Sequence, residues 1–94
     1  MPSASREILV SNKLGLHARP AMQFVDVANQ FQSNIRVTKP AEEGVEADGK
    51  SVMQMICLAA ELGAKLVIEA DGEDAADAVK KLGDLFDEKF GEGE

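Results

Sequence analysis

The sequence predicts an α+β fold, a two-layer open-faced sandwich with the element order β-α-β-β-α-β-α. Three observations support this. Four stretches have the apolar runs or alternation typical of short strands, three others repeat apolar residues at helical spacings, and Gly, Pro, Asn or Asp separate most of them. We expect the helices to cover one face of a four-stranded, mainly antiparallel sheet, because amphipathic helices must bury their apolar stripes against another layer.

The four expected strands are short. The first is residues 8–10, and residues 1–5 before it are expected to be a flexible end. Residues 34–38 alternate between apolar and polar, which predicts a second strand with one buried face. Residues 45–47 are poor strand formers and fit an edge position. Residues 66–70 are the most apolar of the four stretches, so we expect them to form a central strand.

The three expected helices follow these strands. The second begins at a capping box, with Ser51 as N-cap and Gln54 three residues later, and it ends at Gly63. The third opens with acidic residues, which favour the positive end of a helix dipole; Gly83 interrupts it at a cost near ~1 kcal/mol. The expected buried stripes are Ala21, Phe24, Val25, Ala28 and Phe31 in the first helix, and Ala75, Ala78, Val79, Leu82, Leu85, Phe86 and Phe90 in the last.

Length and composition predict one small domain over residues 1–94, with its core at about residues 6–90 and flexible ends. No apolar run is long enough for a membrane span, and no signal-peptide pattern is visible. The net charge of −7 argues against nucleic-acid binding. The single cysteine, Cys57, cannot form an internal disulfide, which fits a reducing cytoplasm. We expect Cys57 to pack as a small apolar residue.

The only histidine, His17, stands where the first strand pattern gives way to the first helix pattern. Pro20 fits the first turn of a helix, because an N–H there would have no intrahelical partner. The helix then directs the free N–H groups of Ala18 and Arg19, and the positive end of its dipole, back at the imidazole. Arg19 adds a guanidinium suited to a phosphate-like anion. These features predict a histidine that carries a phosphoryl group.

Other interpretations of His17 stay open. A single histidine at a helix start is often only a solvated or capping residue. A metal site is not expected, because no second histidine, nearby cysteine or acidic cluster accompanies it, and no cofactor is indicated. An independent enzyme with His17 as general base would need an orienting acid and a substrate pocket, and the segment from Gly15 to Pro20 supplies neither.

The second helix is apolar on nearly every side, which is more than one short core stripe needs. We therefore expect part of it to stay exposed as a docking surface, with complete burial as the alternative. The residues expected on this surface are Val52, Met53 and Ile56, with Met22 of the first helix beside them.

Two segments resemble the signatures of a known family. Gly15-Leu16-His17-Ala18-Arg19-Pro20-Ala21 is similar to the active-site signature of the HPr family, the histidine-containing phosphocarriers of the bacterial phosphoenolpyruvate-dependent phosphotransferase system. Lys50-Ser51-Val52-Met53 resembles the second signature of that family. The similarity extends over residues 6–90, nearly the whole chain.

The resemblance implies a sheet order of 1-4-2-3 and a monomeric carrier. It implies that enzyme I phosphorylates His17 on Nδ1, that Arg19 and the amides of Ala18 and Arg19 hold the phosphate, and that EIIA-type proteins accept the group. Ser51 matches the serine that an HPr kinase/phosphorylase modifies in some bacteria, so a regulatory adaptor switched at Ser51 is the alternative function. Partners are expected to contact Met22, Val52, Met53 and Ile56.

The chain departs from the family pattern in three places. The connection at residues 39–48 is a few residues longer than usual, and Gln54 stands where some members carry a partner-contacting lysine. Residues 12–15 and 21–22 resemble the nitrogen-branch paralogue, whereas Lys50–Met53 resembles the kinase-regulated type. The sugar-transport and nitrogen branches therefore both remain candidates.

Overall fold

The computed structural model describes residues 2–11, 15, 17–41, 45–58 and 61–91. These residues form four strands and three helices, in the order that the sequence predicts, followed by a 3₁₀ turn. The elements are β1 (Ser3–Leu9), α1 (Ala18–Ala28), β2 (Asn34–Thr38), β3 (Glu46–Asp48), α2 (Val52–Cys57), β4 (Lys65–Asp71), α3 (Ala75–Asp87) and the 3₁₀ turn η1 (Lys89–Gly91).

The sheet has the order β1-β4-β2-β3, and every neighbouring pair is antiparallel. Its register pairs Ile8 of β1 with Leu66 of β4, and Val37 of β2 with Ile68 of β4. The central position predicted for β4 and the edge position predicted for β3 are both confirmed. The open-faced sandwich with strand order 1-4-2-3 is confirmed as well.

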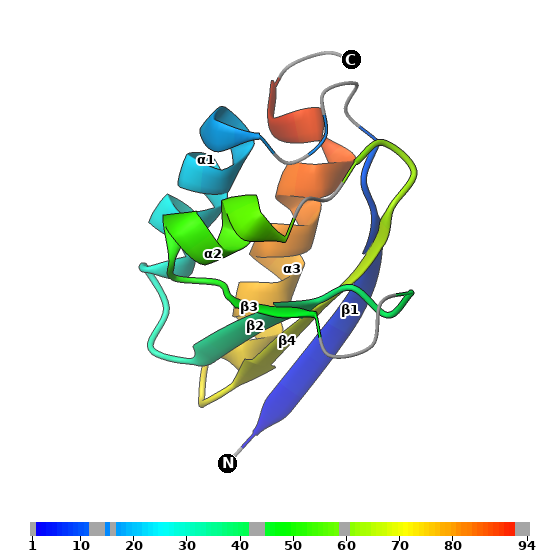
Figure 1. Cartoon of the computed structure of the whole chain (residues 1–94). Coiled ribbons are helices and arrows are strands. Elements are labelled where there is room, and N and C mark those ends of the chain that lie inside the picture. The colour runs from blue at the N-terminus through cyan, green and yellow to red at the C-terminus, as the bar shows by residue number, and fades with distance from the viewer. Residues whose placement is uncertain (1, 12–14, 16, 42–44, 59–60, 92–94) are drawn as a thin grey trace.

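The three helices cover one side of the sheet, and the core lies between the two layers (Figure 1). Phe24 of α1 meets Phe86 of α3 edge-to-face with ring centroids 6.0 Å apart, and Phe86 meets Phe90 at 4.8 Å. Within their bounds α1 and α3 bury the predicted stripes, except that Leu85 is only partly buried. Two predicted members lie outside the helices: Phe31 follows α1 and is partly buried, and Phe90 is buried in η1. None of the described helices is long and apolar enough to cross a membrane.

The first strand begins earlier than predicted. Residues 3–5 belong to β1, because the strand pairs with β4 over its whole length, from Ser3 opposite Asp71 to Leu9 opposite Lys65. The flexible end predicted over residues 1–5 is therefore wrong for this part. Sequence periodicity missed the strand start because a charged residue, Arg6, occupies an inward-facing position.

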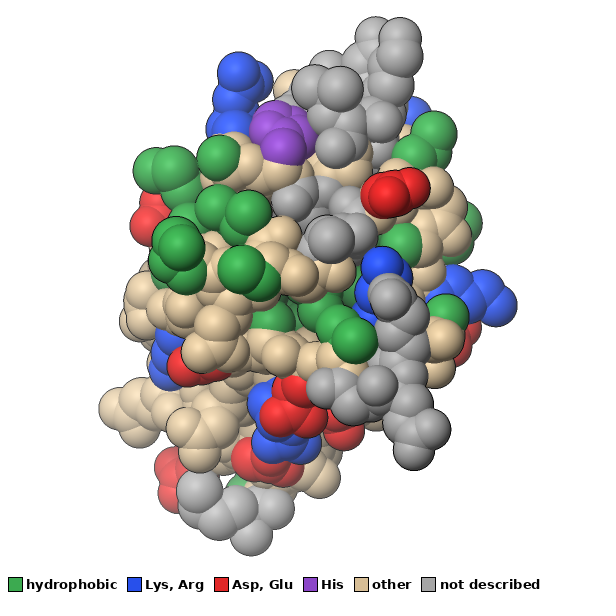
Figure 2. All heavy atoms as spheres, viewed as in Figure 1, with side chains coloured by type: hydrophobic (Ala, Val, Ile, Leu, Met, Phe, Trp, Pro, Cys, Tyr) green, Lys and Arg blue, Asp and Glu red, His purple; other side chains and the backbone are tan. Residues whose placement is uncertain are grey.

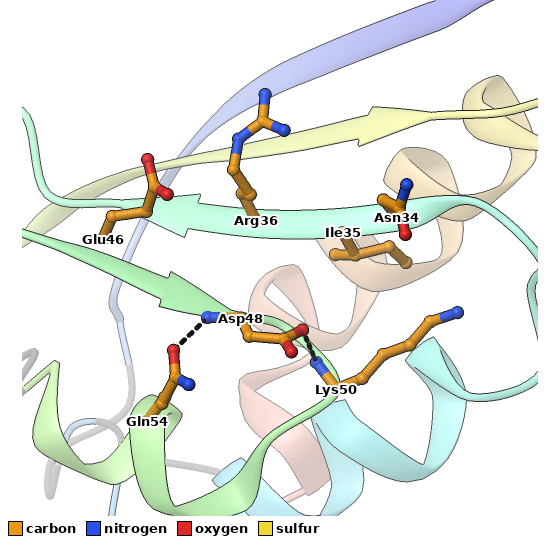
Figure 3. A pocket seen from close by; sticks show the side chains of 7 residues that line it. All are labelled: Asn34, Ile35, Arg36, Glu46, Asp48, Lys50 and Gln54. Carbon is orange, nitrogen blue, oxygen red and sulfur yellow. Dashed lines mark hydrogen bonds between the residues drawn. The ribbon is translucent and has the colours of Figure 1, made fainter.

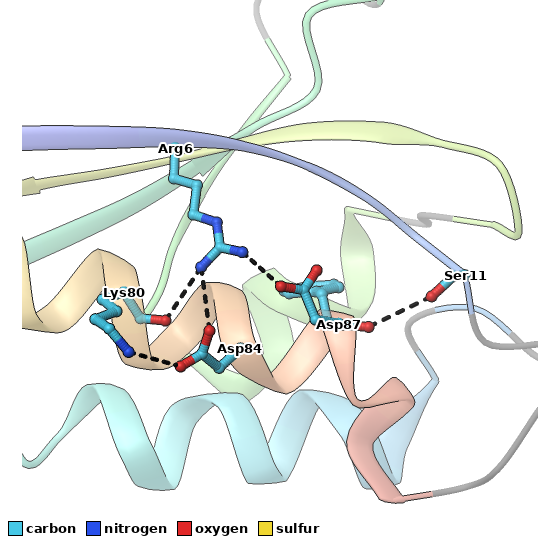
Figure 4. Close-up of polar contacts among 6 residues, drawn as sticks. Arg6, Ser11, Lys80, Asp84 and Asp87 are labelled. Atoms are coloured by element: carbon cyan, nitrogen blue, oxygen red, sulfur yellow. Dashed lines mark hydrogen bonds and ion pairs between the residues drawn. The ribbon is translucent and has the colours of Figure 1, made fainter.

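Arg6 lies across α3 instead of pointing to solvent (Figure 4). Its guanidinium is 2.6 Å from a carboxylate oxygen of Asp87 and 3.4 Å from one of Asp84. Gly83 makes room for it, since a Cβ at that position would lie 2.6 Å from Arg6 Cζ. Lys80 and Arg6 together lower the pKa of the Asp84 carboxyl, with the Lys80 hydrogen bond as the larger cause. Helix α3 runs through Gly83 without a break, so the predicted interruption is wrong, and Gly83 is instead the place where Arg6 crosses the helix.

A second link joins the loop after α1 to the start of α3. Asp74 is the N-cap residue of α3, but its carboxylate makes no capping bond. It accepts hydrogen bonds from the Gln32 amide at 2.8 Å, from the Ser33 amide at 3.0 Å and from the Ser33 hydroxyl. These donors, led by the Ser33 hydroxyl, hold the pKa of Asp74 below its ordinary value. Asp74 thus fixes the loop after α1 against the start of α3.

Candidate functional site

His17 is the N-cap residue of α1. Its backbone is extended, with φ −86° and ψ −170°, and its carbonyl accepts the first helical hydrogen bond from the Ala21 amide at 3.0 Å. The side chain is half-buried and makes no capping bond to the helix. His17 thus occupies the N-cap position, but its side chain does not cap the helix, so the interpretation of the imidazole as a capping group is wrong.

The first turn of α1 presents two amides beside the imidazole. The N–H groups of Ala18 and Arg19 have no acceptor within the helix, since its ladder starts at Ala21, and Pro20 has no N–H. Gly15 precedes this turn with φ +70°, a value that favours glycine, and it is buried. Leu16, expected to anchor the loop, lies outside the described residues.

This arrangement suits an anion. The two amides without an acceptor in the helix and the positive end of the α1 dipole lie at the end of α1 where His17 is the N-cap, and Arg19 is exposed at the second helical position. An imidazole at that place can accept a phosphoryl group whose charge the amides then stabilise. No group of three His, Cys, Asp or Glu side chains that could hold a metal ion occurs among the described residues.

An apolar surface adjoins the imidazole. Met22 of α1 is 54% exposed, and Met53 and Ile56 of α2 are 71% and 38% exposed. Figure 2 shows green apolar side chains gathered over α1 and α2 next to the purple imidazole. We call Met22, Met53 and Ile56 the α1–α2 face. The predicted partial exposure of α2 is confirmed, because α2 buries Met55 and half-buries Val52; the docking role stays a prediction.

Cys57 does not pack as predicted, because its side chain is exposed. Helix α2 has only six residues, and Met55 within it and Leu58 just after it supply its buried contacts. With so short a helix, the position after Ile56 is turned toward solvent. The expectation of a buried small apolar residue was therefore wrong.

Ser51 caps α2 as predicted, since its Oγ accepts a hydrogen bond from the Gln54 amide at 3.2 Å. The reciprocal half of the capping box is absent. The Gln54 side chain accepts from the Asp48 amide at 2.8 Å, and the Ser51 amide donates to the Asp48 carbonyl at 3.0 Å. Gln54 therefore joins α2 to the end of β3 instead of closing the cap, and sequence spacing gave no sign of this.

A pocket of about 290 Å³ lies beside the start of α2 (Figure 3). Its two cations have partners within the protein. The Lys50 ammonium donates to the Phe31 carbonyl at 2.7 Å, and Arg36 pairs with Asp71 at 3.1 Å, which raises the pKa of Arg36. The pocket therefore belongs to the framework around α2 and not to the site at His17. Its lining consists of Asn34, Ile35, Arg36, Glu46, Asp48, Lys50 and Gln54.

Comparison with known proteins agrees with this geometry. A family model described as the PTS HPr component phosphorylation site matches residues 4–88. The chain belongs to the PTS-HPr family. Its solved relatives share the fold: HPr from Thermoanaerobacter tengcongensis superposes with a TM-score of 0.84 at 38% identity, with 98% of each chain covered.

Proteins with similar sequences indicate what this chain does. Phosphocarrier protein HPr of Neisseria meningitidis serogroup A is 44% identical over 95% of this chain and 97% of its own length. Phosphocarrier protein NPr of Proteus mirabilis is also 44% identical, over 93% and 94%. The chain is thus a phosphocarrier that relays phosphoryl groups among proteins of the phosphotransferase system. Identity does not separate the HPr and NPr types, because the two values are equal.

Proposed function

We propose that His17 is the residue that carries the phosphoryl group in this relay. The observation that supports it is the position of His17 as N-cap of α1, next to the two amides of the first turn that have no acceptor within the helix. Arg19 is the proposed phosphate-binding side chain, because it is exposed on that same turn. The family membership supports the reaction type, and the local geometry supports the assignment of residues.

The proposed step is an in-line phosphoryl transfer from phosphorylated enzyme I. The lone pair of Nδ1 of neutral His17 attacks the phosphorus, the proton of the ring stays on Nε2, and a new N–P bond forms. The bond between phosphorus and the donor atom of enzyme I breaks, and its electron pair stays with that donor. The amides of Ala18 and Arg19 and the Arg19 guanidinium stabilise the charge of the transferred group.

The onward step reverses these roles, with an EIIA-type protein as the proposed acceptor. The α1–α2 face is the proposed contact for both partners, with the half-buried Val52 at its edge. We propose a monomeric carrier and not an independent catalyst, because the segment from Gly15 to Pro20 contains no carboxylate to activate water. A cytoplasmic location stays part of the proposal, since a single cysteine fits a reducing compartment.

Mass spectrometry tests this function directly. On addition of enzyme I and phosphoenolpyruvate, the intact chain should gain the mass of one phosphate, and fragmentation should locate that mass on His17. Chain incubated with phosphoenolpyruvate alone is the control and should gain none. A chain that gains no phosphate with both components present, or gains it on another residue, would contradict the proposal.

Replacing Arg19 should slow the transfer without abolishing it. Arg19→Ala removes a charge-assisted contact of about 1.5–3 kcal/mol but leaves the two amides, so the rate should fall roughly ten- to a hundredfold if the contact acts fully in the transition state. Rapid-quench transfer from phosphorylated enzyme I measures this. Lys81→Ala removes a cation of α3 that is also exposed and should leave the rate unchanged. Equal rates for Arg19→Ala and the wild type would mean that Arg19 does not contact the phosphoryl group.

A regulatory adaptor switched at Ser51 is the second candidate function. The supporting observation is that Ser51 begins α2, the helix that carries Met53 and Ile56 of the α1–α2 face. A phosphate on Ser51, added by an HPr kinase/phosphorylase, would lie at a helix start that tolerates negative charge. That charge would then have to lose its hydration whenever a partner covers the face.

Ser51→Asp should therefore slow phosphorylation of His17 by enzyme I by at least about fivefold, which corresponds to about 1 kcal/mol of lost docking energy. Its thermal stability should stay near wild type, because an Asp N-cap can also accept from the Gln54 amide. The control is Ser51→Ala, which should lose about 0.5–2 kcal/mol of stability but transfer phosphate at the wild-type rate. If Ser51→Asp transfers as fast as Ser51→Ala, then Ser51 is a helix cap only.

A further inference from the structure

Helix α2 is too short to hold its own position. It has six residues, Val52–Cys57, and Met55 is the residue that it buries. A helix of this length is not stable in isolation, so its place depends on contacts with the rest of the chain. Among the described elements, its main contacts are with α1 and β3. The attachment of α2 to β3 therefore helps to decide where the exposed side chains of α2 lie.

Strand β3 ends with an amide that points away from the sheet. The strand has three residues and lies at the end of the sheet, beside β2. The next amide, that of Gly49, donates to the Ile35 carbonyl of β2 at 2.8 Å, and amides alternate in direction along a strand, so the Asp48 amide points outward. Without a partner it would be an unpaired group on a free sheet edge. The Gln54 side chain accepts from it at 2.8 Å (Figure 3).

Ser51 and Gln54 hold the start of α2 in different ways. The Ser51 Oγ accepts from the Gln54 amide at 3.2 Å, and the Ser51 amide donates to the Asp48 carbonyl at 3.0 Å. These bonds hold the N-cap, about which a short helix can still pivot. The Gln54 side chain starts from the first turn of the helix and reaches the strand. It therefore supplies a second point of attachment, and two points fix the direction of α2 where one fixes only its start.

This attachment lies next to the exposed residues of α2. Met53, the residue before Gln54, is 71% exposed, and Ile56, two residues after it, is 38% exposed. In Figure 3 the side-chain oxygen of Gln54 is turned toward the Asp48 amide, so this acceptor is already occupied within the protein. A change in the direction of α2 would move Met53 and Ile56 together.

We propose that Gln54 is a positioning residue of the relay: its bond to the Asp48 amide fixes the direction of α2 and so places Met53 and Ile56 for docking. This inference rests on the proposed function and specifies how the α1–α2 face is held. Gln54 lies on α2 and is not assigned to the phosphoryl group, so its loss should weaken docking and leave the transfer step unchanged. The expected change is about three- to tenfold, the size of one net intramolecular hydrogen bond.

Three replacements of Gln54 separate its acceptor atom from size and charge. Gln54→Met keeps the length and removes the acceptor, Gln54→Lys removes the acceptor and adds a charge, and Gln54→Glu keeps an acceptor. Gln30→Met, at an exposed position of the turn after α1, is the matched control. Single-turnover transfer from phosphorylated enzyme I over a range of carrier concentrations gives the half-saturating concentration and the rate at saturation. About 1 M salt reduces the screening length to about 3 Å and so limits the effect of the added charges.

Gln54→Met and Gln54→Lys should raise the half-saturating concentration about three- to tenfold, by the same factor within about twofold, and keep the saturating rate of the wild type. Gln54→Glu and Gln30→Met should match the wild type in both quantities. Amide hydrogen exchange reports the bond directly. The Asp48 amide should exchange faster in Gln54→Met and Gln54→Lys than in the wild type, and Gln54→Glu should restore its protection.

A merely structural role for Gln54 predicts a different result. If Gln54→Met unfolds at a lower temperature but keeps the half-saturating concentration of the wild type, Gln54 only stabilises the fold and the proposal is overturned. A lower half-saturating concentration for Gln54→Lys than for the wild type would show direct contact with an acidic partner surface and would overturn it too. Equal exchange of the Asp48 amide in the wild type and Gln54→Met would show that the bond is not made in solution, with the same consequence.

The wild type separates the failure of this inference from the failure of the proposed function. If the wild type receives phosphate from enzyme I and Gln54→Met docks equally well, this inference alone fails. If the wild type receives no phosphate, the proposed function fails, and this inference with it.

Discussion

His17→Ala is expected to abolish the gain of one phosphate mass that enzyme I and phosphoenolpyruvate produce in the wild-type chain. The ring nitrogen is the proposed attacking atom, and alanine offers no replacement for it. The fold should survive, because the His17 side chain is only half-buried and makes no capping bond to α1. Intact-mass spectrometry and far-UV circular dichroism measure the two parts of this result.

Ser51→Ala is the matched control for that experiment. It removes the other proposed acceptor of a phosphate and keeps His17, so its mass should still rise in full. If His17→Ala still gains phosphate at the normal rate, His17 does not carry the group. If Ser51→Ala fails to gain it, the phosphate that enzyme I adds resides on the serine.

Gly72→Ala should destabilise the chain by about 2–5 kcal/mol, because backbone strain and overpacking add at this position. Gly72 joins β4 to α3 with φ +151°, a conformation that L side chains rarely adopt. A Cβ there would lie 2.8 Å from Ser33 Cα, which is backbone of the loop after α1. Ser33 is buried and donates to Asp74, so its displacement would also disturb the link between that loop and α3. Urea unfolding measures the loss.

Gly63→Ala separates the two causes. Gly63 also has a positive φ, +90°, but no atom of the described residues lies within 4 Å of its Cβ position. It should therefore show the strain alone, about 1–2 kcal/mol. A Gly72→Ala variant no less stable than Gly63→Ala would mean that the loop at Ser33 yields freely.

The fold was predictable from the sequence to the extent that local periodicity reveals burial. Helices α1 and α3 bury apolar residues at spacings of three and four, and β4 alternates Leu66, Ile68 and Ala70 toward the core. Each of these patterns can be read from a single short window. The strand order followed from the family resemblance and not from these patterns.

The features that sequence analysis missed depend on contacts between distant segments. The start of β1 was overlooked because Arg6 replaces an apolar residue at an inward position, and its partner Asp84 is 78 residues away. The Gln54 side chain bonds to the end of β3 instead of to Ser51, a choice that spacing cannot reveal. The exposure of Cys57 follows from the shortness of α2, and helix ends are poorly defined by sequence.

In the candidate site, too, some features could be predicted from a short stretch of sequence and others depend on contacts between distant segments. His17, Arg19 and the amides of the first turn lie within three consecutive residues, so a strand-to-helix change together with Pro20 was enough to predict their arrangement. The α1–α2 face combines Met22 of α1 with Met53 and Ile56 of α2, which are separated from it in the sequence by two strands. Its exposure could be suspected from the excess of apolar residues, but the structure was needed to show that Met55 is buried while Met53 is not.

The crossing of Arg6 over Gly83 couples the residue types that these two positions can hold. A side chain at position 83 and an arginine at position 6 compete for one volume, since the Cβ would lie 2.7 Å from Arg6 Cδ. Once Arg6 is replaced by a small residue, alanine at position 83 gains the roughly 1 kcal/mol of helix propensity that glycine forgoes. Family members should therefore fall into two compatible classes at this pair, arginine with glycine and a small residue with alanine. Arginine with alanine would have the steric overlap, and a small residue with glycine would lose helix propensity without need.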